Sequence, residues 1–88
     1  MARTFKYTVN KKPQQLFTIL KEKLKGQVDI NFVGDENSGK IEGSGFAGDY
    51  IITKTDVGTE IEMTITKKPI IIPWGLIETK LNEELGNL

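Results

Sequence analysis

The sequence has no cysteine and no histidine among its 88 residues. Without cysteine, neither a disulfide framework nor a cysteine-ligated zinc site can form. Without histidine, Ser38 and Ser44 lack the base of a Ser-His-Asp arrangement within one chain. We therefore predict a protein that is not an enzyme, with no catalytic residue, no metal site and no cofactor.

An excess of either charge is also missing, because 12 basic residues are matched by 12 acidic ones. Proteins that bind nucleic acid by releasing counterions need a basic surface, so we expect no nucleic-acid partner. The longest apolar run is far shorter than the ~18 residues of a transmembrane helix, so no transmembrane segment is predicted. Residues 1–4 are polar, unlike the apolar core of a secretory signal. Together with the lack of cysteine, this start predicts a cytoplasmic protein.

What the chain does contain is typical of one small domain that covers residues 1–88. Hydrophobic residues make up 38% and charged residues 27% of the sequence, a balance that argues against a disordered chain. A domain of this size buries only roughly 60–65% of its unfolded surface, so its stability margin is small. Self-association as a homodimer would add to that margin.

Polar and apolar residues alternate in five segments, with the period of two that indicates β-strands. These segments are residues 4–9, 28–32, 40–46, 49–55 and 59–66. The last is the most regular, since Thr59, Ile61, Met63 and Ile65 alternate with Glu60, Glu62, Thr64 and Thr66. One face of this strand is predicted to contact the core and the other the solvent.

Two segments show the spacing of an amphipathic helix. The first runs from Pro13 to Lys25 and stops at Gly26, with an apolar stripe of Leu16, Phe17, Leu20 and Leu24. The second begins near Pro73 and ends at Gly86, with a stripe of Trp74, Ile77, Leu81 and Leu85. The order β-α-β-β-β-β-α predicts an α+β fold, a single antiparallel sheet with two helices on one face.

Residues 43–48 match the dinucleotide-binding pattern G-x-G-x-x-G. That site needs a helix after the glycines, whose first amides receive the pyrophosphate. Here the glycines lead into Tyr50 and a predicted strand, so nucleotide binding is not expected. We interpret Gly43, Gly45 and Gly48 as glycines of a bent strand. A glycine inside a strand indicates a bulge, a sharp bend or another element lying close to it.

The polar segment 34–40 resembles two ligand-binding loops without completing either. A phosphate-binding loop would need Ser or Thr where Ile41 stands. A calcium loop would need glycine at the sixth position, which is Lys40, and a carboxylate at the twelfth, which is Phe46. We predict an ordinary hairpin loop.

A short apolar run, Ile70, Ile71 and Ile72, lies between Pro69 and Pro73 and leads into Trp74. In an extended segment Ile71 would face away from Ile70 and Ile72, so one of the two sides would lie outside a single sheet layer. That side needs a hydrophobic ligand, an apolar surface or a partner subunit to cover it. Trp74 is expected to belong to the core end of the last helix.

Several features occur in a recognisable order: the helix Pro13–Lys25, the segment Gly43-Ser44-Gly45-Phe46-Ala47-Gly48-Asp49-Tyr50-Ile51, the strand Glu60–Thr66, and the proline-flanked run before Ile77-Glu78. In this arrangement the chain resembles a small bacterial family described as polyhydroxyalkanoic acid system proteins, which are associated with polyester storage granules. That family is richer in Arg and often has a His near its N-terminus, and this chain has neither trait. The resemblance implies an accessory role at a granule and brings no catalytic residues.

We expect Ile70, Ile71, Ile72 and Trp74 to meet a hydrophobic ligand or a polyester granule. The alternative is a homodimeric interaction domain of undetermined role, whose subunit interface is this run. A third hypothesis is a small enzyme that uses Tyr50 and carboxylates in a cleft beside the glycine-rich strand.

Overall fold

The computed structural model describes residues 2–24 and 31–86 and contains five strands and two α-helices in the predicted order β-α-β-β-β-β-α. The strands are β1 (Arg3–Val9), β2 (Asn31–Gly34), β3 (Ser38–Gly43), β4 (Phe46–Thr55) and β5 (Gly58–Lys67). The α-helices are α1 (Pro13–Ile19), which continues as the π-helical segment η1 (Leu20–Leu24), and α3 (Trp74–Leu85).

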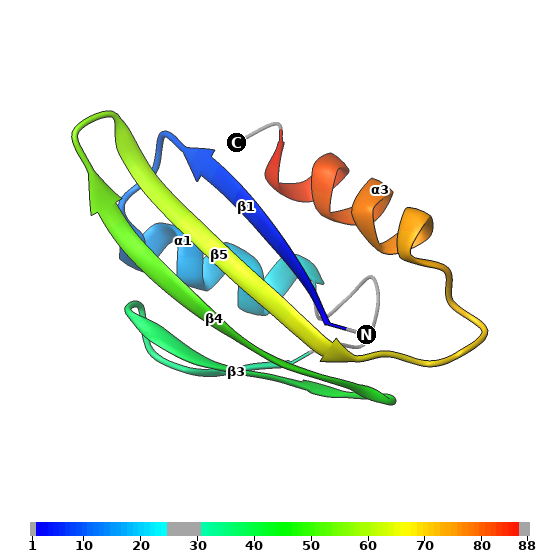
Figure 1. Cartoon of the computed structure of the whole chain (residues 1–88). Helices are drawn as coiled ribbons and strands as arrows, with labels where there is room; N and C mark the ends of the chain where they lie inside the picture. The colour runs from blue at the N-terminus through cyan, green and yellow to red at the C-terminus, as the bar shows by residue number, and fades with distance from the viewer. Residues whose placement is uncertain (1, 25–30, 87–88) are drawn as a thin grey trace.

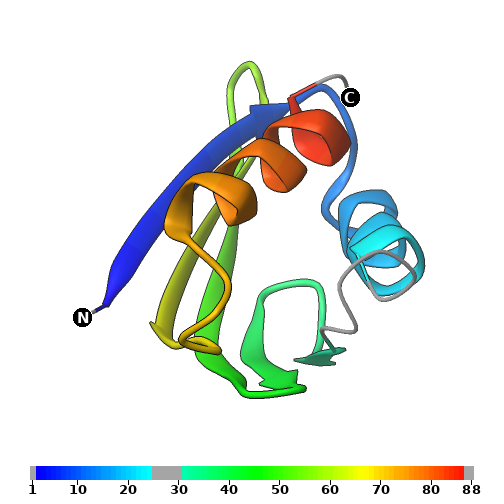
Figure 2. The same cartoon turned by 90° about the vertical axis from the view of Figure 1, so that its right-hand side faces the viewer.

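All five strands belong to one sheet with the order β1-β5-β4-β3-β2, and every neighbouring pair is antiparallel. Both helices lie on the same face of this sheet, with α3 running beside β1 (Figure 1). The end view shows the strands curving around the two helices (Figure 2). The predicted α+β fold, a single antiparallel sheet with two helices on one face, is therefore confirmed.

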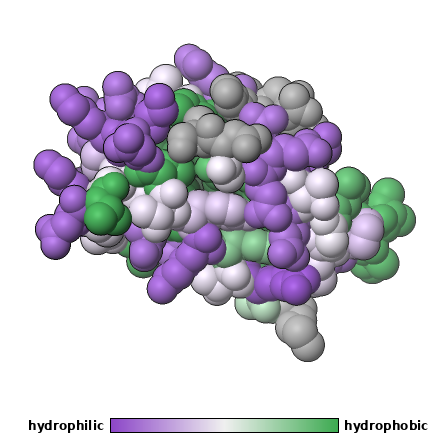
Figure 3. Space-filling view, turned by 90° about the horizontal axis from the view of Figure 1, so that it is seen from above, coloured by the Kyte–Doolittle hydropathy of each residue, from purple (hydrophilic) through white to green (hydrophobic). Residues whose placement is uncertain are grey.

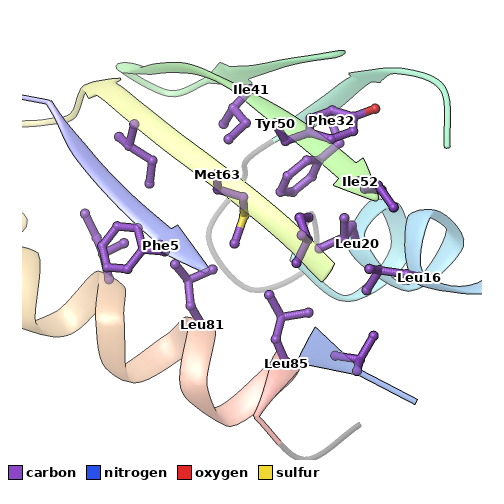
Figure 4. Close-up of a cluster of buried hydrophobic side chains, with 14 of the residues drawn as sticks. Phe5, Leu16, Leu20, Phe32, Ile41, Tyr50, Ile52, Met63, Leu81 and Leu85 are labelled. Atoms are coloured by element: carbon purple, nitrogen blue, oxygen red, sulfur yellow. The ribbon is translucent and has the colours of Figure 1, made fainter. Parts of the chain in front are cut away.

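The core lies between the sheet and the helices, and its side chains point inward from both (Figure 4). The most regular of the predicted strands behaves as expected, because Ile61, Met63 and Ile65 of β5 are buried. Glu62 lies on the opposite face, where its carboxylate pairs with the Lys6 ammonium at 3.5 Å. The helical segments add further side chains to this core. Leu16 comes from α1 and Leu20 from η1, and α3 contributes Ile77, Leu81 and Leu85.

Tyr50 of β4 is a fully buried aromatic side chain that connects three elements. Its ring stacks near Phe17 of α1, with centroids 6.2 Å apart, and meets Phe32 of β2 edge-on at 5.5 Å. Its hydroxyl donates a 2.7 Å hydrogen bond to the Asp35 carbonyl oxygen. Such a bond satisfies the polar end of a buried tyrosine and fixes the ring's position.

The glycine-rich segment forms a hairpin turn instead of one bent strand, so this part of the prediction was wrong. β3 ends at Gly43, and Gly43 pairs with Phe46 across a two-residue turn. The turn residues Ser44 and Gly45 have φ angles of 46° and 88°, and Gly43 has 117°. Positive φ at both central positions is the geometry that fits the twist of a tight hairpin, and glycine adopts it without steric cost.

Gly48 does lie inside a strand, at a register shift between Ala47 and Gly48 of β4. A Cβ atom at this position would collide with the carbonyl oxygen of Thr64 on β5. A bulge and a close neighbour, two of the reasons considered for glycines inside a strand, are therefore found together at Gly48.

The first helix differs from the prediction in its second half. Its α-helical part ends at Ile19, and the chain then continues in π-helical turns to Leu24. The predicted end at Lys25–Gly26, and the strand residues Val28 and Ile30, lie outside the described residues. Of the predicted strand 28–32, the structure contains Asn31 and Phe32 within β2.

Two glycines offer a matched test of this packing. Gly48→Ala should lower the free energy of unfolding by about 1–3 kcal/mol, since the new methyl group meets backbone that cannot rotate away. Gly75→Ala in α3, where no atom lies within 4 Å of the new methyl, should raise it by about 0.5–1 kcal/mol. Urea unfolding of both variants checks the pair, and equal effects would contradict the bulge geometry.

Tyr50 should also make stability depend on pH. Burial, and secondarily the Asp35 carboxylate, raise the pKa of its hydroxyl above the ordinary value. Its contribution is therefore fully present below the unfolded pKa of about 10 and is lost as pH rises through the higher folded pKa. Tyr50→Phe should cost about 1 kcal/mol at neutral pH and weaken the alkaline loss. Tyr7→Phe, measured alongside by urea unfolding, separates the contribution of the second tyrosine, whose pKa is also raised by burial.

Candidate functional site

The proline-bounded run forms a turn that joins β5 to α3. The Ile72 amide donates to the Pro69 carbonyl oxygen at 3.2 Å, which closes a four-residue turn. Ile70 and Ile71 occupy its two central positions and are 95% and 91% exposed. We call these two residues the isoleucine tip.

This geometry corrects the expectation of an extended segment in which Ile70 and Ile72 share one side. A turn places its central residues at the outside of the bend, so Ile70 and Ile71 both face away from the protein. Ile72 instead packs, partly buried, against the hydrophobic core. The run thus separates into two exposed residues and one that belongs to the domain.

Trp74 is the first residue of α3 and is also partly buried against the core. Its ring lies 6.2 Å from that of Phe5 at an angle of 42°. This packing agrees with the expected place of Trp74 at the core end of the helix. Two cations approach the same ring, the Arg3 guanidinium at 5.8 Å and the Lys68 ammonium at 5.5 Å.

Neighbouring elements hold the base of the tip in place. The Lys68 ammonium donates to the Pro69 carbonyl oxygen at 3.3 Å. The β3–β4 turn touches the same proline, because a Cβ built on Gly45 would lie 3.1 Å from Pro69 Cγ. A shallow pocket of about 320 Å³ lies here, lined by Thr66, Lys67, Lys68, Ile70 and Trp74.

Apolar atoms project beyond the polar body at one end of the molecule (Figure 3). The end is that of the β5–α3 connection in Figure 1, where the isoleucine tip supplies the two most exposed large apolar residues. Leu76, in the first turn of α3, is 49% exposed. Val57, the most exposed large apolar residue after the tip at 78%, lies at the opposite end in the β4–β5 turn. Two adjacent isoleucines at this exposure form a patch, whereas single exposed residues are ordinary.

The polar loop between β2 and β3 has a structural role in the described part of the chain. The Asp35 carboxylate accepts hydrogen bonds from the amides of Asn37 at 2.8 Å and Ser38 at 3.0 Å. These amides lower the pKa of Asp35 because they stabilise the charged form. Among the described residues, no three His, Asp or Glu side chains are grouped closely enough to hold a metal ion.

The tyrosine and glycines of the third hypothesis are occupied by packing. The Tyr50 hydroxyl donates its hydrogen bond to the Asp35 carbonyl oxygen. The glycines form the β3–β4 turn and the β4 bulge. A larger groove of about 690 Å³ is lined by residues that include Lys11, Pro13, Lys54 and Thr59, and neither Tyr50 nor Gly43, Gly45 or Gly48 is among its lining residues. In this groove the Thr59 hydroxyl donates to the Lys11 carbonyl oxygen at 2.5 Å, which joins β5 to the segment before α1.

The sequence analysis did not predict that Arg3 and Lys68 lie at the candidate site. Arg3 reaches it because β1 pairs with β5, with Arg3 opposite Ile65, so the start of the chain lies beside the end of β5. No local pattern connects Arg3 to Trp74. The pair Lys67-Lys68 directly before Pro69 was visible in the sequence and was a usable signal.

Comparison with known proteins adds evidence on the fold. No family model matches the chain, and no curated protein matches it. Among solved structures, the crystal structure of protein SSP2350 from Staphylococcus saprophyticus is similar, with a TM-score of 0.54 and 16% sequence identity. The alignment covers 98% of this chain and 82% of that one. At this identity the likeness shows a shared fold and nothing about function.

In the described part of the chain, no helix has both the length and the apolar composition that a membrane span requires.

The division of the run predicts different effects on stability. Ile70→Ser with Ile71→Ser should change the free energy of unfolding by less than about 0.5 kcal/mol, because both side chains are already in water. Ile72→Ser should lower it by about 1–2 kcal/mol, because a partly buried side chain is lost from the core. Urea unfolding measures both, and a large loss in the double variant would show that the tip is covered in solution.

Proposed function

We propose that this protein is a non-enzymatic binding protein that docks on an apolar surface through its isoleucine tip. The observation that carries the proposal is the exposure of Ile70 and Ile71 at 95% and 91%. Burying two such side chains releases roughly 3–6 kcal/mol, enough to support docking once the cost of association is met.

The shape of the tip favours a surface over an enclosed ligand. Ligand pockets are concave and bury most of the ligand. The two isoleucines instead stand on a projecting turn, and the pocket beside them is shallow. Pro69 and Pro73 restrict the backbone on either side of the turn, which reduces the entropy lost when the tip docks.

The sequence resemblance suggests which surface this is. If the chain acts like the polyhydroxyalkanoic acid system proteins, the surface is that of a polyester granule. The cytoplasmic location expected from the sequence belongs to the same proposal.

The test is partitioning onto uncoated polyester particles. The wild-type chain should sediment with the particles, and Ile70→Ser with Ile71→Ser should weaken binding by about 3 kcal/mol, roughly a hundredfold. Val57→Ser is the matched control, since it removes an exposed apolar residue from the opposite end and should leave binding unchanged. If the double variant binds as tightly as the wild type, the tip is not the docking surface.

A homodimer that buries the tip is the second candidate, and it rests on the same exposure. Sedimentation velocity at several dilutions distinguishes the two. A dimer of the wild type that the double isoleucine variant converts to a monomer would replace the surface proposal with a subunit interface.

A further inference from the structure

We infer that the surface on which the isoleucine tip docks is a phospholipid layer with anionic headgroups. This inference rests on the proposed function, because it names the chemistry of the surface that the tip meets. The observation behind it is a group of cations around the tip: Arg3, Lys67 and Lys68, which we call the basic collar.

The collar adjoins the tip from two strands and the loop. Lys67 is the last residue of β5 and Lys68 follows it, directly before the turn that carries the tip. Arg3 begins β1, and its guanidinium lies 5.8 Å from the Trp74 ring. Arg3 and Lys67 are exposed, so their charged groups are available to a partner.

Two carboxylates lie in the neighbourhood and do not pair with the collar. Glu42 shares the cross-strand row of Lys67, but Ala47 stands between them, so they are about two strand spacings apart, roughly 10 Å. Glu78 lies one turn along α3 from Trp74 and faces Tyr7, whose pKa is raised by burial and then by the Glu78 charge. Among the described residues, the ion pairs of this fold join Lys6 to Glu62 and Lys80 to Glu83.

An apolar tip with cations beside its base matches the cross-section of a lipid surface. Isoleucine side chains enter the acyl region, and basic side chains attract the anionic headgroups just above it. Tryptophan is enriched at this depth because it has an apolar body and a polar N–H. Trp74 lies here, between the tip and the domain.

The other occupants fit the charges less well. Docking on an uncharged surface would remove the charged groups of the collar from water without supplying an anion to pair with them, which costs free energy. A two-fold dimer formed through the tip would bring the three cations of one collar close to the three of the other, because such an interface joins the same patch from both copies. Only an anionic surface satisfies the apolar and the basic groups together.

The experiment measures co-sedimentation of the full chain with two kinds of vesicle at low salt. One kind is pure phosphatidylcholine, and the other has one part phosphatidylglycerol to two parts phosphatidylcholine. The wild type should bind the anionic vesicles more tightly, and Arg3→Gln with Lys67→Gln should weaken that binding about fivefold per charge, roughly 25-fold together. Raised salt should reduce the preference, because it screens the headgroup charge.

Lys11→Gln with Lys54→Gln is the matched control, since it removes two exposed cations from the far end of the domain and should leave the preference intact. The cations that lie over the Trp74 ring are Arg3 and Lys68, so Lys67→Gln alone leaves that packing intact. This single variant should weaken binding to the anionic vesicles about fivefold. Equal binding to both kinds of vesicle, or a control pair that acts like the collar pair, would overturn the inference.

The uncoated polyester particles separate this result from the proposed function. Binding to particles through the tip, with no preference for anionic vesicles, would reject the lipid inference and leave the proposed function standing. If the wild type binds neither the polyester particles nor the vesicles, both the lipid inference and the proposed function are rejected.

Discussion

The buried side chain of Tyr50 is the constraint on which the folded domain depends. It is fully buried in β4, its ring contacts aromatic residues of α1 and β2, and its hydroxyl reaches a loop carbonyl oxygen. A Cβ on Gly39 would lie 2.7 Å from this hydroxyl, and one on Gly34 would lie 3.0 Å from it. The absence of side chains at both glycines therefore makes the room that Tyr50 needs, and the β2–β3 hairpin closes over it.

This arrangement leaves the end of the molecule that we propose as the docking surface outside the core packing. Tyr50 belongs to the core between the sheet and the helices, while the β5–α3 connection projects from the end of the sheet. Ile72 and Trp74 anchor that connection, so Ile70 and Ile71 can remain exposed without loss of core packing. Two adjacent exposed isoleucines contribute nothing visible to folding, and this is the physical reason for assigning them to binding.

The basic collar places positive charge next to the apolar tip. Under the proposed lipid binding, cations beside an apolar projection would favour a charged, layered partner over a uniform hydrophobic one, because the former satisfies both kinds of group. The collar is assembled from the start of β1 and the end of β5 by antiparallel pairing. A fold of this class, shared with a protein at 16% identity, carries no such information by itself.

The amino-acid sequence by itself determined the element order, the α+β class and the core face of β5, because alternation and helical spacing report directly on burial. It also marked Pro69–Trp74 as unusual. Tertiary structure decided the rest. Positive φ at Ser44 and Gly45 made a hairpin turn where a bent strand was expected. A turn in place of an extended segment put Ile71 beside Ile70 and sent Ile72 to the core. Strand pairing brought Arg3 to Trp74. Contacts between residues so distant in the chain depend on how the backbone folds, and local patterns cannot encode them.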